Sequence, residues 1–198
     1  YAVTVLDRGG DVRGRRPALA QLNRDGLLDE ENNYCFGEGG AGTFSDGKLY
    51  TRSTKKGSIR DVLEVFVAAG APTRVLTDAR PHIGTNRLPK VVETFRNAMV
   101  EAGANFRFHT KVVDLERHID GVRITLSCGE HIIAPMAVLA TGHSANDTYE
   151  LLLKRDVSLV PKAFAMGVRI EHPQALIDNI QYGSYAGHAG LGAAPYQL

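Results

Sequence analysis

The sequence has no tryptophan and only two cysteines among its 198 residues. Cys35 and Cys128 belong to no Cys-x-x-Cys pair, and they share no metal-ligand spacing with the seven histidines. This pattern favours neither a disulfide framework nor a structural zinc site. We therefore expect no metal, and we expect both cysteines to be buried, reduced and small apolar residues.

Long apolar runs and an excess of one charge are also missing. No stretch approaches the roughly 20 apolar residues that span a bilayer, and no signal peptide is visible, so we expect a cytoplasmic protein without a membrane partner. The formal net charge is +1 and the basic residues are scattered, apart from Arg13 to Arg16 and Lys55 with Lys56. This argues against nucleic acid as the main partner.

Two stretches have apolar residues at helical spacing. They predict helices over residues 58–69 and 88–102, each followed by a glycine that suits a helix end. After Gly103 the pattern changes to clusters of β-branched residues between turn signals, which predict a strand and then a small antiparallel meander. The expected strands cover residues 105–109, 111–117, 121–127 and 131–134.

Three further runs are read as strands. Residues 1–6 form a valine-rich run that predicts a buried strand ending in a turn. Residues 136–140 are uniformly apolar, as in a strand buried on both faces of a parallel sheet. Residues 163–170 predict another strand, followed by a short helix opened by His172 and Pro173. Because the first strand starts at residue 1 and the tail closes no recognisable unit, both ends of the chain look cut.

A helix is also expected to start near Ala145, after the apolar run. Ser144 or Asn146 could cap it, because both side chains accept hydrogen bonds from a free helix N–H. The preceding Ala140, Thr141 and Gly142 would let a ligand approach the backbone at the carboxyl edge of the sheet. An ordinary turn between strand and helix explains these residues nearly as well.

Asp7 follows the first strand, where a dinucleotide-binding unit places a carboxylate that accepts hydrogen bonds from the ribose hydroxyls. The matching Gly-x-Gly-x-x-Gly turn is expected roughly 20 residues upstream, before residue 1. A strand-final aspartate also commonly caps a turn. His82 likewise allows two interpretations, an active-site acid or base and a residue that makes a local hydrogen bond.

The glycine-rich stretch at residues 37–47 contains two literal motif matches, and each lacks a feature that its motif requires. Gly37, Gly39 and Gly42 satisfy Gly-x-Gly-x-x-Gly, but no adequate strand precedes them and no clean helix follows. Gly42 to Lys48 satisfies the P-loop pattern, but Leu49 stands where a triphosphate site needs a hydroxyl for magnesium. A P-loop-like nucleotide-binding enzyme is therefore the least favoured hypothesis.

A different interpretation of the same stretch fits better. Four glycines within six residues, from Gly37 to Gly42, let backbone N–H groups approach an anionic or planar ligand. Thr43, Ser45 and Lys48 would add side-chain donors. A compact structural loop is the alternative.

Several segments together resemble one family, the uncharacterised FAD-dependent (NAD(FAD)-utilizing) dehydrogenases of bacteria, which are related to glutathione-reductase-like and aminoacetone-oxidase-like flavoproteins. The resembling segments are residues 5–9, 36–49, 81–89, 140–145 and 167–174. The resemblance implies that Asp7 binds the adenosine ribose, that residues 39–45 wrap the pyrophosphate and the flavin, and that the backbone of Val112 meets the adenine. The implied cofactor-binding residues are Asp7, Arg8, Gly39, Gly40, Ala41, Gly42, Thr43, Phe44, Ser45, Lys48, Val112, Ala140, Thr141 and Gly142.

The resulting expectation is an α/β chain. Residues 1–157 would form a partial FAD/NAD(P)-binding, Rossmann-like three-layer domain with a β-meander, lacking its N-terminal Gly-x-Gly-x-x-Gly unit. Residues 158–198 would begin a mixed α+β substrate domain. The chain would be a fragment of an FAD-dependent oxidoreductase that takes electrons from NAD(P)H and transfers a hydride through the flavin to an unknown small-molecule substrate.

The fragment alone is expected to be inactive and to hold FAD weakly. No pair of titratable residues stands at a spacing that identifies a catalytic acid or base. The rival hypothesis is a truncated, non-catalytic scaffold that binds a partner or self-associates through unfinished sheet edges.

Overall fold

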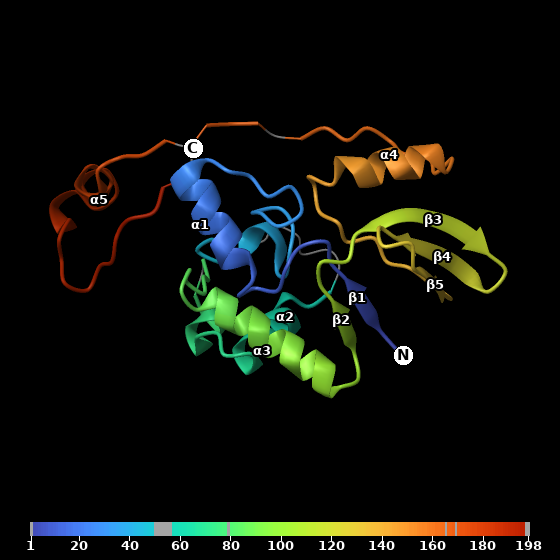
Figure 1. Ribbon diagram of the computed structural model, residues 1–198. Coiled ribbons are helices and arrows are strands. Elements are labelled where there is room, and N and C mark those ends of the chain that lie inside the picture. Colours follow the sequence, from blue (N-terminus) through green and yellow to red (C-terminus); the bar gives the residue numbers. More distant parts are fainter. Residues whose placement is uncertain (1, 50–56, 79, 165, 169, 197–198) are drawn as a thin grey trace. The chain divides into compact units, whose positions relative to one another are not determined.

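The computed structural model describes residues 2–49, 57–78, 80–164, 166–168 and 170–196 (Figure 1). Lys55 and Lys56 lie outside the described residues. The chain divides into two compact units, Tyr1–Leu159 and Val160–Leu198, and each is described by itself. The architecture is mixed α and β, with a two-stranded and a three-stranded sheet. Within the described parts of the chain, no helix has both the length and the apolar character needed to cross a membrane.

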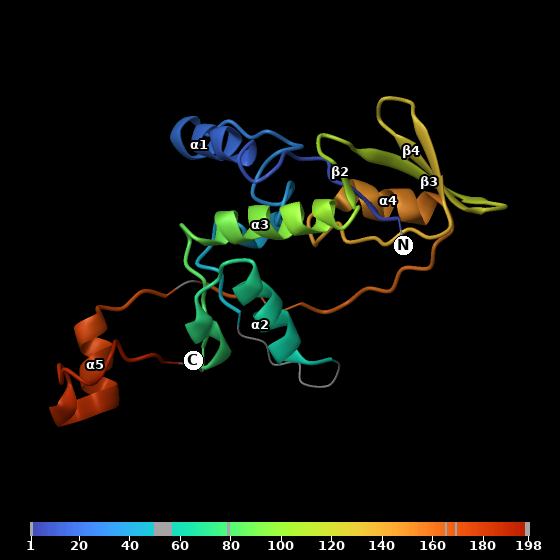
Figure 2. The same cartoon turned by 90° about the horizontal axis from the view of Figure 1, so that it is seen from below.

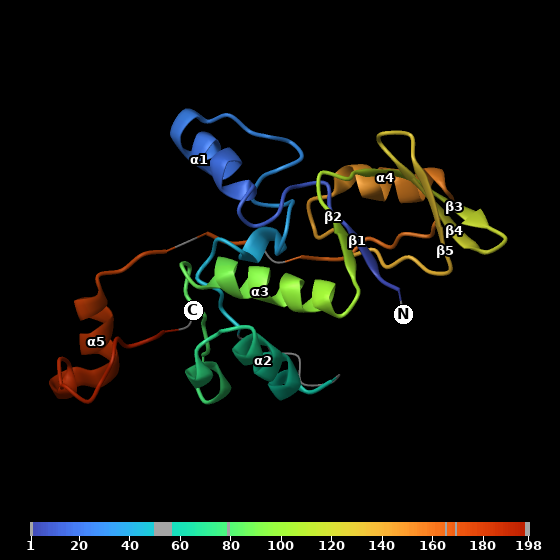
Figure 3. The ribbon, with the colours of Figure 1, turned by 60° about the horizontal axis from the view of Figure 1, so that its bottom comes forward.

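The first sheet pairs β1 (Thr4–Leu6) with β2 (Asn105–Arg107) in parallel, as Figure 3 shows. The bonding continues past the strands, because Asp7 N donates to Arg107 O at 3.0 Å and Thr110 N donates to Asp7 O at 2.8 Å. The first strand was predicted correctly, but its burial was not. Val3 and Val5 are 48% and 36% exposed, because no further strand pairs with β1 among the described residues.

The two predicted helices are confirmed. The α2 helix (Ile59–Ala68) begins after Ser58, whose Oγ accepts a hydrogen bond from Asp61 N at 3.2 Å. The α3 helix (Leu88–Glu101) has Pro89 in its first turn, where a missing N–H costs nothing. The main apolar cluster lies around the short 3₁₀ turn η2 (Thr73–Leu76) and the start of α3. It consists of Ala69, Ala71, Ile83, Leu88 and Val91.

A helix that the sequence did not predict, α1, spans Arg15–Asp25. It is polar, and only Arg15 and Leu19 in it are buried, so it lacks the apolar stripe that predicts a helix. Gly26 ends it in the left-handed conformation (φ 70°). Its buried arginine proves central to the site described below.

The predicted meander is confirmed as β3 (Val112–His118), β4 (Gly121–Leu126) and β5 (His131–Ala134), paired antiparallel in chain order. A bulge interrupts the register between Val112 and Asp114. The predicted burial of the cysteines is wrong, since both are exposed. Cys128 occupies the turn between β4 and β5, where a side chain points into solvent.

The strand predicted at residues 136–140 is not formed. This run has no ladder partner in the part of the chain that the structure describes, and Met136 and Val138 are 72% and 83% exposed. An apolar run becomes a strand only where a neighbouring strand accepts its backbone hydrogen bonds. The α4 helix (Asn146–Lys154) then packs against β3 (Figure 2). The expected caps are also wrong, because Ala145 is the N-cap and no side chain caps the helix.

In the second unit, α5 (Gln174–Tyr182) confirms the helix predicted after Pro173, and a 3₁₀ turn, η3 (Gly183–Tyr185), follows it. Asp178 ties the tail to this helix, because its Oδ1 accepts a hydrogen bond from Ala194 N at 2.8 Å. The strand predicted at residues 163–170 is absent from the described part of that range; residues 165 and 169 lie outside it. No strand elsewhere in the described ranges pairs with the apolar residues there.

Candidate functional site

Asp7 stands at the carboxyl edge of the parallel strands and bonds to the turn that follows β1. Its Oδ1 accepts hydrogen bonds from Gly9 N at 2.9 Å and from Gly37 N at 3.0 Å. Its Oδ2 accepts no hydrogen bond from the described residues. Asp7 therefore caps the turn and tethers a distant segment, and it keeps one oxygen for a further donor.

The tethered segment is residues 36–49, called here the glycine segment. It crosses the turn after β1 at very close range: a Cβ on Gly9 would lie 2.6 Å from the Cα of Gly37. Glu38 N also donates to Gly10 O at 3.0 Å. Glycine at position 9 is therefore needed for the backbones to meet.

Arg15 holds the glycine segment through buried hydrogen bonds. Its side chain is fully buried, and its Nη1 donates to Glu38 O at 2.5 Å, to Gly40 O at 3.0 Å and to Thr43 Oγ1 at 3.2 Å. Its Nη2 donates to Asn33 O at 2.9 Å. Burial lowers the pKa of Arg15, and the charges of Asp7 and Glu38 act in the opposite direction.

Two buried polar side chains complete this anchorage. Glu38 accepts a hydrogen bond from Val12 N at 2.7 Å and pairs with Arg96 Nε at 2.7 Å. Thr43 donates its hydroxyl to Glu38 O at 3.0 Å. The predicted ligand donor Thr43 thus bonds within the segment, and Phe44 lies 5.1 Å from the guanidinium of Arg15.

The outer side of the glycine segment is open. Gly39, Ala41 and Gly42 are exposed, and a Cβ on Gly40 or Gly42 would meet no atom within 4 Å. The N–H groups of Gly39 and Ala41 have no partner among the described residues. Ser45 is used locally, since its hydroxyl donates to Gly42 O at 2.7 Å. The segment therefore offers backbone donors and free space on one side.

The two literal motif matches lack their structural context, as expected. The only helical turn at Gly42 is the three-residue η1 (Gly40–Gly42), and no strand leads into Gly37. Lys48 does not open a helix; it is exposed and forms an antiparallel bridge with His82.

This bridge brings together two segments that carry the family resemblance, residues 36–49 and 81–89. Leu49 N donates to Pro81 O at 2.9 Å, and Ile83 N donates to Gly47 O at 3.1 Å. His82 has its Nε2 at 3.5 Å from Arg74 Nη2, a local contact rather than a catalytic pair.

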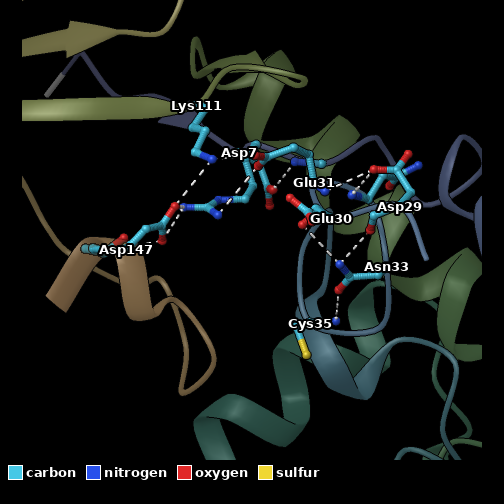
Figure 4. A network of polar contacts seen from close by, with 12 residues as sticks. Asp7, Asp29, Glu30, Glu31, Asn33, Cys35, Lys111 and Asp147 are labelled. Carbon is cyan, nitrogen blue, oxygen red and sulfur yellow. Dashed lines mark hydrogen bonds and ion pairs between the residues drawn. The ribbon is translucent and has the colours of Figure 1, made fainter. Parts of the chain in front are cut away.

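A network of charged residues joins the carboxyl edge to α4 (Figure 4). Arg8 contacts both carboxylate oxygens of Asp147, at 2.9 and 2.8 Å, and lies 4.4 Å from the ring of Phe36. Lys111 bonds to Glu31 and lies 3.4 Å from Asp147. Burial alone would raise the pKa of Asp147, but the hydrogen bonds from Arg8 and Lys111 and the charge of Arg8 hold it below its ordinary value. The hydrogen bond to Glu31 raises the pKa of Lys111.

The remaining predicted residues lie around this network. Val112 begins β3 directly after Lys111 and lines an open groove of about 510 Å³ between β3 and α4. Ala140, Thr141 and Gly142 are exposed in the segment that leads into α4, and Gly142 O accepts a hydrogen bond from the Tyr149 hydroxyl at 3.3 Å. The structure thus gathers Asp7, Arg8, the glycine segment and Val112 at one edge.

Sequence reasoning missed the residues that hold the site together. Arg15, Glu38 and Asp147 make its main anchoring contacts. The available signals were a glutamate inside a glycine run and an arginine cluster without periodicity, and neither pattern names a partner. Among the described residues, no group of three or more His, Cys, Asp or Glu side chains is placed to hold a metal ion.

Comparison with known proteins links the chain to flavoproteins. Residues 163–198 match the family described as FAD-dependent protein, C-terminal domain-like. Over all 198 residues the chain is 41% identical to an uncharacterized protein of Clostridium beijerinckii (strain ATCC 51743 / NCIMB 8052). The chain spans 37% of the length of that relative. These similarities indicate a flavoprotein-related chain and identify no substrate or reaction.

Proposed function

We propose that this chain supplies part of the FAD site of a larger oxidoreductase, with the glycine segment and the carboxyl edge of β1 and β2 facing the cofactor. One observation carries the proposal: among the described residues, backbone N–H groups without an acceptor, an open glycine surface and a carboxylate oxygen of Asp7 without a donor occur at the same edge. The match of residues 163–198 to an FAD-dependent family supports the choice of cofactor.

The residues present fit FAD in their chemistry. Asp7 Oδ2 can accept a hydrogen bond from a ribose hydroxyl, and the N–H groups of Gly39 and Ala41 can donate to phosphate oxygens. An added Cβ at Gly42 would meet no atom within 4 Å, so a planar group could approach the backbone there. Val112 lines a groove beside the same edge, where an adenine could lie.

When bound, FAD supplies a two-electron acceptor whose flavin N5 takes or gives a hydride. The residues of this chain would bind and orient it, and the electron donor would be NAD(P)H, as the family resemblance implies. In the same proposal, residues 1–157 belong to a Rossmann-like three-layer domain and residues 158–198 begin the substrate domain. The reaction itself belongs to the larger protein.

Equilibrium dialysis of the purified chain against FAD tests this proposal, because it detects weak binding that gel filtration loses. We expect saturable binding, measured by the flavin absorption on the protein side. In Gly42→Leu, a side chain fills the open space, so the affinity should fall by about tenfold or more, the effect of blocking one good contact.

The matched control is Gly192→Leu, in the second unit. Gly192, like Gly42, has no atom within 4 Å of an added Cβ and no left-handed φ. This variant should bind FAD as the wild type does. The proposal fails if the wild type does not bind FAD, or if both leucine variants bind it equally well.

A second candidate function is self-association through the two-stranded sheet. The exposed Val5 on β1 and Val3 just before it favour this function, because β1 has an edge without a partner among the described residues and such an edge recruits other strands. Sedimentation velocity should then show dimers that Val5→Lys removes. A chain that stays monomeric at about 100 μM, a concentration at which exposed edges associate, would dismiss this candidate.

A further inference from the structure

Arg15 is a buried cation whose direct partners include no carboxylate. Among the described residues its hydrogen bonds go to five backbone carbonyls and one hydroxyl, of Asn33, Tyr34, Gly37, Glu38, Gly40 and Thr43. Burying a charge is costly unless its hydrogen bonds are made, and Arg15 makes them to neutral groups. What these hydrogen bonds do to the peptide units that accept them therefore indicates the role of the arginine.

The bonds to Arg15 fix the direction of two peptide units. A trans peptide is planar, and its C=O and N–H point in opposite directions; the described chain contains no cis peptide. The carbonyl of Glu38 points to Arg15, so the N–H of Gly39 points away from it. The carbonyl of Gly40 also points to Arg15, which turns the N–H of Ala41 outward.

These are the two outward N–H groups that have no partner among the described residues. Gly39 and Gly40 both have left-handed φ angles, 78° and 64°, so the backbone adopts a conformation that most side chains would resist. The intervening N–H of Gly40 is used within the turn, since it donates to Gly37 O at 2.9 Å, and backbone N–H groups that point out of a turn attract anions. The guanidinium charge beneath them has the right sign to assist.

Arg15 itself cannot touch a ligand on that surface. Gly37 covers it so closely that a Cβ there would lie 2.4 Å from Arg15 Cδ. Apart from the attraction of its charge, Arg15 can therefore act on a ligand only through the peptide units that it orients. Its role is therefore that of a positioning residue.

We propose that Arg15 holds the peptide units of the glycine segment so that the N–H groups of Gly39 and Ala41 point outward and bind the diphosphate of the cofactor. This inference rests on the proposed function and adds to it a positioning residue, Arg15, that lies outside the segment. The backbone donors would contact the diphosphate, and the buried arginine would hold these donors in place.

The test uses Arg15→Lys with ADP as a probe that carries the diphosphate without the flavin. Lysine keeps the charge but loses the planar fork that reaches both sets of carbonyls. In the wild type, ADP should shift the amide resonances of Gly39 and Ala41 in a saturable way. In Arg15→Lys these shifts should disappear, and the Kd for ADP and for FAD should rise by about tenfold or more, as when a charge-assisted hydrogen bond is lost.

Arg16→Lys is the matched control, because Arg16 is the exposed neighbour on the same helix. It should bind ADP as the wild type does. A folded Arg15→Lys chain that binds ADP within about twofold of the wild type, less than one hydrogen bond contributes, overturns the inference.

A second pair of variants keeps the test decisive if Arg15→Lys does not fold. Ala41→Pro removes one outward N–H without touching Arg15, and Ala41→Ser retains it. Only the proline variant should lose ADP affinity; equal affinity in both overturns the inference. A wild-type chain that binds FAD without shifting Gly39 and Ala41 refutes the role of Arg15 alone, whereas a chain that binds neither FAD nor ADP refutes the proposed function as well.

Discussion

The glycine segment and the apolar run at residues 136–140 reverse the usual relation between composition and order. The glycine segment is rich in the most flexible residue, yet Arg15, Glu38 and Thr43 hold it with buried hydrogen bonds. The apolar run has the composition of a strand, yet it is largely exposed and has no ladder partner among the described residues. Local order in this chain follows from satisfied backbone groups more than from apolar content.

The largest expected effect on stability concerns Arg15, which holds the glycine segment. Arg15→Met should lower the free energy of unfolding by about 3–5 kcal/mol, because it leaves several buried carbonyls without donors. Urea unfolding followed by far-UV circular dichroism measures it. Arg16→Met, at an exposed position, should change the same quantity by less than about 0.5 kcal/mol, and similar losses in both variants would contradict the anchoring role of Arg15.

A smaller effect should separate two glycines of the same segment. In Gly37→Ala the new Cβ would meet the fixed side chain of Arg15 at a φ of 100°, so we expect a loss of about 2–4 kcal/mol. In Gly42→Ala the Cβ enters open space, and the change should be within about 0.5 kcal/mol. Thermal unfolding of the two variants distinguishes a close crossing of backbones from a loosely packed loop, which would tolerate both.

The charged network between the carboxyl edge and α4 should give a modest, pH-dependent effect. The pKa of Asp147 is depressed in the folded chain, so its contribution is present above the unfolded value of about 3.9 and is lost as the pH falls through the folded value. Because the side chain is partly exposed, we expect Asp147→Asn to cost about 1 kcal/mol at neutral pH.

That difference should shrink below about pH 4 as the carboxylate is protonated. Urea titrations of wild type and variant at several pH values measure it. A difference that persists unchanged at about pH 2.5, well below the ordinary range for aspartate, would show that Asp147 acts through packing instead of charge.

The smallest effect belongs to the exposed apolar run. Val138→Thr removes apolar character at a position that is 83% exposed, so the free energy of unfolding should change by less than about 0.5 kcal/mol. Chemical denaturation is again the measurement. A loss above about 1 kcal/mol, as for a buried methyl group, would mean that this run is covered in solution and would erase the contrast with the glycine segment.

The same contrast explains what could be predicted from the sequence. The α2 and α3 helices and the β3–β5 meander follow from local spacing and turn residues, and these predictions are confirmed. The α1 helix was missed because its buried positions include an arginine, and the run at residues 136–140 was misread because apolar spacing does not reveal a pairing partner.

The candidate site was predicted only as a set of segments. Asp7 and the glycine segment could be proposed from motif context, but Arg15 could not, because its main partners are backbone groups 18 to 25 residues away. Backbone carbonyls are the same in every residue, so no pattern of side chains points to such contacts. The assignment of individual residues to the cofactor stays a prediction.

Amide hydrogen exchange with and without FAD tests the central claim most directly. We predict that FAD slows exchange in the glycine segment, above all at Gly39 and Ala41, and leaves the exposed turn between β4 and β5 unchanged. If FAD leaves exchange in the glycine segment unaltered, or protects only regions away from the carboxyl edge, then this segment does not face the cofactor and the account is wrong.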